Sequence, residues 1–343
     1  MGSDVVLQGA LAKVVLKSRP NGMPDTQDFA LETFSLPPLR EGEILQQIEY
    51  LSIDPYMRVR MSAEPSYAPP MAIGETMPGH TIGRVLESRD PALAPGDAVL
   101  SYSGWQSQAV TPGKNIHKLD RDALPVTTAL GVRGMPGLTA YGGLLAIGQP
   151  KAGETVIVAA ATGPVGSVVG QIARLKGARA VGITGGAQKC TLLLERFGFD
   201  AAVDHRSPTF AEDLRRACPN GIDIYFENVG GAVLEAVLPL LNEFARIPLC
   251  GLVAQYNDQD PFAQWELQGF LRRLLFKSAT VRGFLAGEFE AQWGPLFRKE
   301  MGEWLKSGQI QYLEDVVDGL ENAPAALIRM LSGGNLGKLV IRL

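Results

Sequence analysis

The alternation of apolar and polar residues changes character partway along the chain. Up to about residue 127, short β-prone runs are separated by turns rich in Pro and Gly. These runs are AKVVLKS at residues 12–18, EILQQIEYLSID at 43–54, IGRVLES at 82–88 and DAVLSYSG at 97–104. Such spacing is typical of a compact, mostly antiparallel β domain.

From Thr155 onward, short apolar strands alternate with amphipathic helices. Strands are predicted at residues 155–160, 178–183, 201–205, 222–229 and 245–251, with helices through 171–177 and 191–198. A helical stretch at 265–276, a strand at 280–284, a long helix at 289–306 and a terminal strand at 337–343 follow. This order predicts a doubly wound parallel α/β sheet with helices on both faces.

A glycine-rich turn, A-T-G-P-V-G at residues 161–166, joins the first of these strands to a helix. Gly163 allows the backbone to approach a pyrophosphate, and Gly166 allows the helix to pack closely on the sheet. Ala161 stands where the usual fingerprint has its first glycine, so a plain strand-to-helix turn is the alternative. With Val165 between the two glycines, the turn indicates a dinucleotide site.

The residues around the turn favour NADPH over NADH. An NAD site usually carries Asp or Glu about 20 residues past the turn, on the ribose hydroxyls. No Asp or Glu occurs between residues 155 and 194. The second strand is followed instead by Thr184, Gly185 and Lys189, whose ammonium would stabilise a 2′-phosphate. His205 and Arg206 follow the third strand at the same sheet edge, although Lys189 as a surface charge and His205 as a structural residue are alternatives.

Charge and composition exclude several classes of protein. The 343 residues carry 32 Lys and Arg against 36 Asp and Glu, without a basic block, so no nucleic-acid partner is expected. No run approaches the roughly 20 apolar residues of a membrane helix, and the N-terminus lacks a signal-peptide pattern. We therefore expect a cytoplasmic enzyme with two domains.

Metal and nucleophile chemistry have no sequence support. The three histidines show no ligand spacing, and no G-x-S-x-G elbow occurs. The three cysteines are far apart and are expected to be small buried hydrophobic residues. No metal is expected, and chemistry would rest on hydride transfer from the cofactor.

Tyr256 is the candidate proton donor. It lies in the loop after the predicted fifth strand, and such loops face the cofactor cleft of an open α/β sheet. A tyrosine hydroxyl can stabilise an enolate or relay a proton to it. The alternative is that Tyr256 only anchors a surface loop.

Several motifs together resemble the zinc-free medium-chain reductases, and more narrowly the prostaglandin and leukotriene reductases, plant alkenal double-bond reductases and bacterial curcumin reductases. They are LSIDPYMRVRM at 51–61, RGMPGLTAYGGL at 133–144, the glycine turn, GIDIYFENVGG at 221–231, AQYN at 254–257 and GGNLGKLV at 333–340. The resemblance implies a GroES-like domain at 1–127, completed by about 310–343, and a Rossmann domain at 128–309. It also implies a homodimer.

The same resemblance implies NADPH-dependent reduction of the carbon–carbon double bond of an enone or enal, with Tyr256 holding the enolate. Lys189 corresponds to a 2′-phosphate lysine, and Asn228 and Asn335 to cofactor-binding asparagines. Further expected cofactor contacts are Pro136, Val165, Gly185 and His205, and the expected substrate pocket contains Tyr56, His80 and Met135. His205 and His80 depart from the family, which often has tyrosine at the first position and a variable residue at the second.

Two alternatives to enone reduction stay open. A quinone reductase on the same fold would use the same cofactor site and depend less on Tyr256. A non-catalytic nucleotide-binding relative would bind NADPH without oxidising it.

Overall fold

The computed structural model describes residues 11–64, 66–258 and 267–343. The chain forms two compact units, each treated by itself. The first contains Met1–Leu130, Val316–Ser332 and Leu339–Leu343, and the second contains Gly131–Asp315 and Gly333–Lys338. No helix among the described residues is long and apolar enough to cross a membrane.

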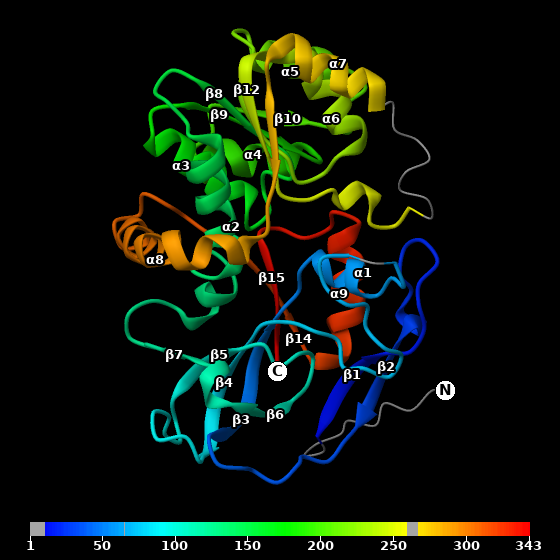
Figure 1. The fold of residues 1–343 in the computed structure, drawn as a ribbon, viewed down its shortest axis with the longest axis vertical. Helices are drawn as coiled ribbons and strands as arrows, with labels where there is room; N and C mark the ends of the chain where they lie inside the picture. Colours follow the sequence, from blue (N-terminus) through cyan, green and yellow to red (C-terminus); the bar gives the residue numbers. More distant parts are fainter. Residues whose placement is uncertain (1–10, 65, 259–266) are drawn as a thin grey trace. The chain divides into compact units, whose positions relative to one another are not determined.

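The second unit is built on a six-stranded sheet (Figure 1). The strands are β8 (Thr155–Val158), β9 (Arg179–Thr184), β10 (Ala201–Asp204), β11 (Ile222–Phe226), β12 (Leu241–Leu249) and β13 (Thr280–Gly283). They lie in the order β10-β9-β8-β11-β12-β13, and every neighbouring pair is parallel. The predicted doubly wound parallel sheet is therefore confirmed.

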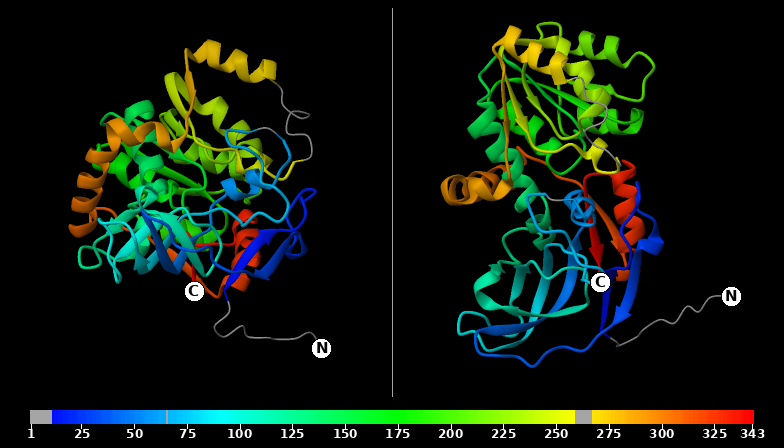
Figure 2. Two further views of the ribbon diagram at one scale, coloured as in Figure 1. Left: turned by 60° about the horizontal axis from the view of Figure 1, so that its bottom comes forward. Right: turned by 45° about the vertical axis from the view of Figure 1, so that its right-hand side comes forward.

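Helices cover both faces of this sheet (Figures 1 and 2). Successive strand residues point to opposite faces, so Val156 and Val158 join one core cluster and Ile157 and Ala159 join the other. The helices are α2 (Met135–Gly142), α3 (Gly166–Leu175), α4 (Ala187–Glu195), α5 (Phe210–Ala217), α6 (Gly231–Val237), α7 (Leu267–Lys277) and α8 (Glu290–Lys306). A strand buried on both faces is mostly apolar, which is why Thr155 in β8 is followed by Val, Ile and Val.

Some predicted element bounds differ from the structure. The strand expected at 155–160 ends at Val158, because Ala160 adopts a left-handed backbone conformation with φ 52°. The strand expected from residue 245 already begins at Leu241. The helix expected at 265–276 is seen as α7, and Trp265 lies outside the described residues.

The first unit is β-rich and antiparallel, which confirms the predicted fold of the N-terminal part. A hairpin pairs β1 (Ala12–Leu16) with β2 (Phe29–Thr33). The larger sheet contains β3 (Glu43–Ser52), β4 (Thr81–Ser88), β5 (Ala98–Ser101), β6 (Gln108–Pro112), β7 (His117–Leu119), β14 (Glu314–Asp318) and β15 (Lys338–Arg342). Its helices are α1 (Tyr56–Arg60) and α9 (Ala323–Leu331).

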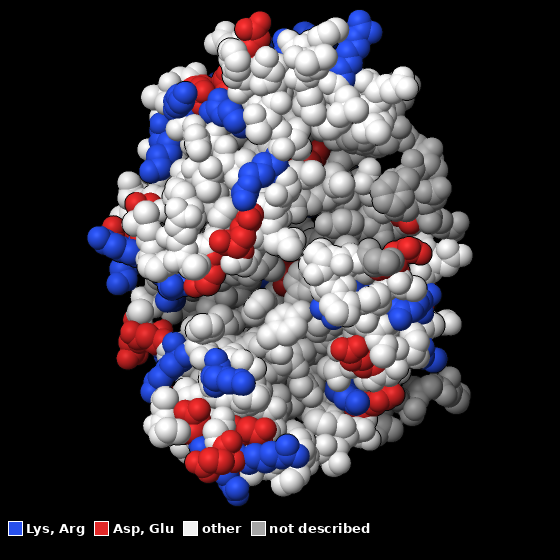
Figure 3. Space-filling view, in the orientation of Figure 1, with Lys and Arg blue, Asp and Glu red and all other residues white. Residues whose placement is uncertain are grey.

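The terminal strand β15 pairs antiparallel with β3, with Val340 opposite Ser52. Basic and acidic side chains are interspersed on the face of the molecule shown in Figure 3.

The register of the parallel sheet brings several loops to one edge. Val158 of β8 is aligned with Gly182 of β9 and Phe226 of β11, and Asp204 of β10 is aligned with Thr184 of β9. The loops that leave the carboxyl ends of these strands therefore start side by side. This is the edge at which open α/β sheets bind their ligands.

Candidate cofactor site and active site

The glycine turn depends on two residues that allow close approach. A Cβ added to Gly166 would lie 2.6 Å from the carbonyl oxygen of Ala160, so only glycine lets α3 begin against the turn. The Gly163 amide donates a hydrogen bond to the same oxygen at 3.0 Å. Ala160, and not Ala161, occupies the left-handed position at which glycine is the usual residue. Val165 is the residue immediately before α3, whose N-terminus is a favourable place for an anion.

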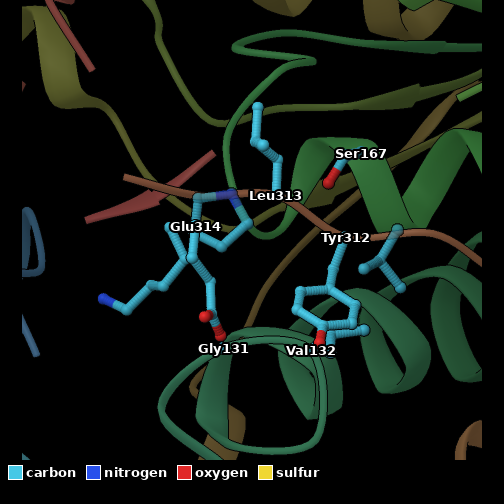
Figure 4. A pocket seen from close by; sticks show the side chains of 9 residues that line it. Gly131, Val132, Ser167, Tyr312, Leu313 and Glu314 are labelled. Carbon is cyan, nitrogen blue, oxygen red and sulfur yellow. The ribbon is translucent and has the colours of Figure 1, made fainter. Parts of the chain in front are cut away.

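A small cavity lies beside this turn (Figure 4). Its lining includes Gly131 and Val132 from the segment before α2, Ser167 from α3, and Tyr312. The volume is about 10 Å³, which is enough for about one water molecule.

Three basic side chains meet where β9 and β10 end. A Cβ on Gly185 would lie 2.8 Å from Arg206 Nε and 2.9 Å from His205 Nε2, so the absence of a side chain at Gly185 lets both groups sit there. Lys189 donates from Nζ to the carbonyl oxygen of Gly333 at 2.8 Å. Arg206 Nη2 would lie 3.6 Å from a Cβ on the same Gly333.

The basic cluster is electrostatically suited to an anion. Partial burial and the neighbouring Arg206 hold the pKa of Lys189 below its usual value, against the opposite effect of Asp315. Partial burial, Arg206 and Lys189 likewise lower the pKa of His205, and Asp204 opposes them. Like charges held together raise the free energy of the cationic forms, and a bound phosphate would lower it.

Asp204 organises this cluster, and the sequence analysis missed it. Its Oδ1 accepts hydrogen bonds from the Gly186 and Arg206 amides, both at 2.9 Å. These amides and the neighbouring cations hold the pKa of Asp204 below its usual value. An Asp at the last position of a strand, before two basic residues, is the sequence signal for such a turn.

Thr184 faces the glycine turn from the end of β9. It is buried, and its hydroxyl lies 3.1 Å from the Thr162 hydroxyl. The pair links the second strand to the turn. A direct contact between Thr184 and a cofactor stays a prediction.

The two predicted asparagines occupy different surroundings. Asn228 follows β11, and its Nδ2 donates to the carbonyl oxygen of Ala159 at 2.8 Å, directly beside the glycine turn. Asn335 donates from Nδ2 to the Gly337 carbonyl at 2.9 Å, within its own turn. Because Lys189 binds Gly333, the segment that carries Asn335 is attached to the basic cluster.

Tyr256 lies in the loop after β12, as predicted. It follows a short 3-10 turn at Val253–Gln255, and its hydroxyl would be 3.1 Å from a Cβ on Gly251. Burial raises the pKa of the Tyr256 hydroxyl, although the Leu252 backbone acts in the opposite direction. The phenol is therefore protonated at neutral pH and is placed at the carboxyl edge of the sheet.

Two predicted pocket residues are brought together in the first unit by Tyr102, which the sequence analysis missed. The Tyr56 hydroxyl lies 3.3 Å from the Tyr102 hydroxyl. The His80 ring packs edge-on against Tyr102, with centroids 4.9 Å apart. Burial, Asp54 and Tyr102 raise the pKa of Tyr56, so this phenol also stays protonated. The position of Tyr102 just after β5 is the only sequence signal for it.

Met135 and Pro136 belong to the second unit, at the start of α2. Pro136 is buried in the first turn of the helix, where a missing amide proton costs nothing. The carbonyl oxygen of Met135 accepts a hydrogen bond from the Thr139 hydroxyl at 2.7 Å. Their predicted roles toward substrate and cofactor stay predictions.

Within the described part of the chain, no three His, Cys, Asp or Glu side chains come together as a metal-binding group. Of the three free cysteines, Cys218 is buried, whereas Cys190 and Cys250 are only partly buried. The expectation of small buried hydrophobic residues is thus confirmed for Cys218, and Cys250 packs against the core of the second unit although it is only partly buried. Cys190 lies on α4, and Cys250 lies in the loop after β12.

The chain matches two family models. Residues 12–119 match the N-terminal domain of oxidoreductase, and residues 164–300 match the model described as zinc-binding dehydrogenase. The fold and the site thus define an oxidoreductase of the medium-chain dehydrogenase/reductase class.

Individual relatives narrow this class. The chain is 51% identical over 329 residues to the NADPH-dependent curcumin reductase of Escherichia coli, covering 96% of this chain and 95% of the relative. It is 38% identical over 335 residues to the NADP(+)-dependent 2-alkenal reductase of Nicotiana tabacum, covering 96% of each. The crystal structure of CurA from Vibrio vulnificus in complex with NADPH superposes with a TM-score of 0.93 at 48% identity, covering 96% of this chain and 98% of that one.

The chain therefore belongs to the zinc-free medium-chain reductase family, in the branch of the NADPH-dependent curcumin and alkenal reductases. The family resemblance seen in the sequence motifs is confirmed.

Proposed function

We propose that this protein reduces the carbon–carbon double bond of α,β-unsaturated aldehydes and ketones with NADPH. The observation that carries the proposal is the position of Tyr256, a protonated and partly buried phenol at the carboxyl edge of the sheet. The Tyr256 loop is hydrogen-bonded to residues 227–230, here called the Asn228 turn. The Asn228 side chain in this turn donates to the Ala159 carbonyl, just after β8. The names of the curcumin and 2-alkenal reductases support the substrate class.

The residues at the sheet edge fit NADPH. Gly163 leaves room for a pyrophosphate at the start of α3, Gly166 lets that helix begin against the turn, and a cluster of Lys189, His205 and Arg206 suits a 2′-phosphate. A carboxylate aimed at the ribose would oppose that phosphate, but the two carboxylates near this cluster are held by backbone amides: Asp204 by those of Gly186 and Arg206, and Asp315 by that of Leu336. When bound, NADPH supplies the hydride that the β-carbon of the substrate accepts.

Tyr256 has the chemistry to stabilise the enolate that forms when the substrate accepts the hydride. As hydride reaches the β-carbon, negative charge moves through the conjugated system to the carbonyl oxygen. A phenol whose pKa is raised by burial remains a hydrogen-bond donor at neutral pH and stabilises this enolate oxygen. Protonation of the α-carbon then completes the addition of one hydride and one proton across the double bond.

The substrate pocket is proposed to include Tyr56, His80 and Met135. Tyr56 and His80 both contact Tyr102, which gives the first unit a cluster of aromatic groups with polar edges. Such groups suit a flat conjugated molecule with one or two oxygens, because rings stack on apolar faces and hydroxyls bind at the edges.

The experiment is an NADPH-oxidation assay with a 2-alkenal, an aryl enone and a quinone, run with the wild type and with Tyr256→Phe. We expect the wild type to convert the enal and enone to saturated products, identified by mass spectrometry. Tyr256→Phe should lower enone turnover about 100-fold while the Kd for NADPH stays unchanged. Unchanged turnover in the variant, or activity with the quinone alone, would contradict the proposal.

A further inference from the structure

Glu227 shapes the turn that carries Asn228. Its side chain is 1% exposed, and its Oε1 accepts hydrogen bonds from the Val229 amide at 2.6 Å and the Gly230 amide at 3.0 Å. These two bonds fold the chain back directly after β11. Asn228 lies at the tip of the fold, from which its Nδ2 reaches the Ala159 carbonyl. A side-chain oxygen that binds nearby backbone amides fixes local backbone geometry in this way.

The same residue connects the turn to the loop after β12. The Glu227 amide donates to the Pro248 carbonyl at 3.0 Å. The Glu227 carbonyl accepts from the Cys250 and Gly251 amides, at 2.9 Å and 3.2 Å. Through its backbone, Glu227 thus holds the end of β12 beside the end of β11.

The Tyr256 loop is built on the turn that Glu227 forms. The Val253 amide donates to the Asn228 carbonyl at 3.2 Å, and the Ala254 amide donates to the Val229 carbonyl at 3.0 Å. The Tyr256 amide then donates to the Val253 carbonyl at 3.4 Å. A change in the Asn228 turn is therefore transmitted to Tyr256 through two consecutive backbone bonds.

Only one oxygen of the Glu227 carboxyl, Oε1, binds the backbone amides of the turn. The Tyr225 hydroxyl lies close to the carboxyl, yet Oε2 has no partner in hydrogen-bond geometry among the described residues. An amide in place of the carboxyl keeps the acceptor Oε1 and sets its nitrogen beside the Tyr225 hydroxyl, whose oxygen accepts hydrogen bonds. Glutamine is therefore a conservative replacement at this position, and alanine is not.

We propose that Glu227 is a positioning residue that sets the Asn228 cofactor contact and the Tyr256 hydroxyl in one fixed arrangement. The proposal rests on the proposed function, because it assigns to Glu227 the alignment of those two groups. It predicts that loss of the Oε1 acceptor weakens NADPH binding and slows enone reduction together.

The test compares Glu227→Ala, Glu227→Gln and Glu154→Ala in the full-length protein. Glu154 is a matched control, because it pairs with Arg246 at 2.6 Å at the opposite, amino edge of the same sheet. The measurements are the Kd for NADPH from nucleotide fluorescence, kcat with a 2-alkenal at saturating NADPH, and Tm.

We expect Glu227→Ala to raise the Kd about tenfold and to lower kcat about 10- to 100-fold. Glu227→Gln should recover most of both losses, and Glu154→Ala should lower Tm without changing Kd or kcat. A folded Glu227→Ala with wild-type Kd and kcat overturns the proposal, and so does a Glu227→Gln as impaired as the alanine variant.

If Glu227→Ala does not fold, Glu227→Asp replaces it, because the shorter side chain withdraws the carboxyl from the Val229 and Gly230 amides. The same losses are then expected, and wild-type Kd and kcat would again overturn the proposal. Should the wild type reduce no enone, the proposed function fails, whereas the Kd measurements still decide whether Glu227 holds the Asn228 turn.

Discussion

At the scale of single residues, we expect cofactor choice to depend on two cations near Gly185, Lys189 on α4 and Arg206 in the turn after β10. Lys189 is held by the Gly333 carbonyl, and the Arg206 backbone is held by Asp204. Their positions are fixed before any nucleotide binds, which reduces the ordering entropy that binding must overcome.

Lys189→Ala should weaken NADPH binding about tenfold or more and leave NADH binding nearly unchanged. The reason is that the ammonium interacts with the 2′-phosphate, which NADH lacks. Titration calorimetry with both nucleotides measures the difference. Lys176→Ala, on the exposed turn after α3, is the control. An equal loss for both nucleotides would remove Lys189 from the 2′-phosphate site.

His205 should make NADPH affinity dependent on pH. Its pKa is below the ordinary 6.5 in the free protein, and a bound phosphate raises it again. Binding then takes up a proton, so NADPH affinity should increase as the pH falls from about 8 to about 6. Without nucleotide the sign is reversed: the folded state loses stability as the pH falls below the ordinary value, because the unfolded chain binds the proton first.

The control for this pH dependence is His205→Asn, which cannot titrate. The pH dependence of NADPH affinity that remains in this variant reports the titration of the 2′-phosphate itself. The difference between the variant and the wild type reports the titration of His205. NADH affinity should stay flat in both proteins. Identical pH profiles for NADPH in the variant and the wild type would show that His205 does not respond to the cofactor.

At the scale of elements, the glycine before α3 and a glycine inside α3 have different surroundings. A Cβ on Gly170 would lie 2.0 Å from the Phe199 ring, so this glycine serves packing. A Cβ on Gly163 meets nothing nearer than the Ala160 carbonyl at 3.2 Å, so we expect this glycine to serve the approach of a ligand. Gly163 lies in the turn before α3 and Gly170 lies within the helix, and the two positions are expected to respond differently to alanine.

Gly170→Ala should destabilise the protein by about 2 kcal/mol, because overpacking forces the Phe199 ring to move. Gly163→Ala should change stability by less than about 0.5 kcal/mol and weaken NADPH binding about tenfold. Urea unfolding and nucleotide titration measure the two effects. A Gly170→Ala variant as stable as wild type would show that Phe199 relaxes at no cost, and wild-type NADPH affinity in Gly163→Ala would remove the turn from the pyrophosphate site.

At the scale of the whole molecule, the cofactor should stabilise the fold through the loops it joins. The glycine turn, the basic cluster and the Asn228 turn leave three different parts of one sheet edge. A ligand that binds only the folded state at about 100 times its Kd adds about 2.7 kcal/mol of stability. NADPH should therefore raise Tm more than NADH at equal concentration, and Lys189→Ala should abolish the difference. Equal Tm increases by NADPH and NADH in the wild-type protein would contradict the cofactor preference. The expected homodimer stays a prediction.

The sequence by itself determined the fold class, the glycine turn and the cofactor preference, because each depends on local pattern. Strand and helix periodicity, the position of Gly163 and Gly166, and the absence of acidic residues after the turn are all properties of neighbouring residues. The position of Tyr256 could also be predicted from the sequence, since a loop after a parallel strand lies at the ligand-binding edge of the sheet.

The tertiary structure alone decided which distant residues meet. The roles of Asp204, Tyr102 and Glu227 arise from the partners that folding brings within hydrogen-bond distance, such as Gly186, Tyr56 and Pro248 respectively. The left-handed position at Ala160, one residue before the one that the motif suggests, likewise follows from how β8 ends against β9. Periodicity reports which face a residue occupies, whereas contacts between loops depend on strand order and register, which only the assembled sheet fixes.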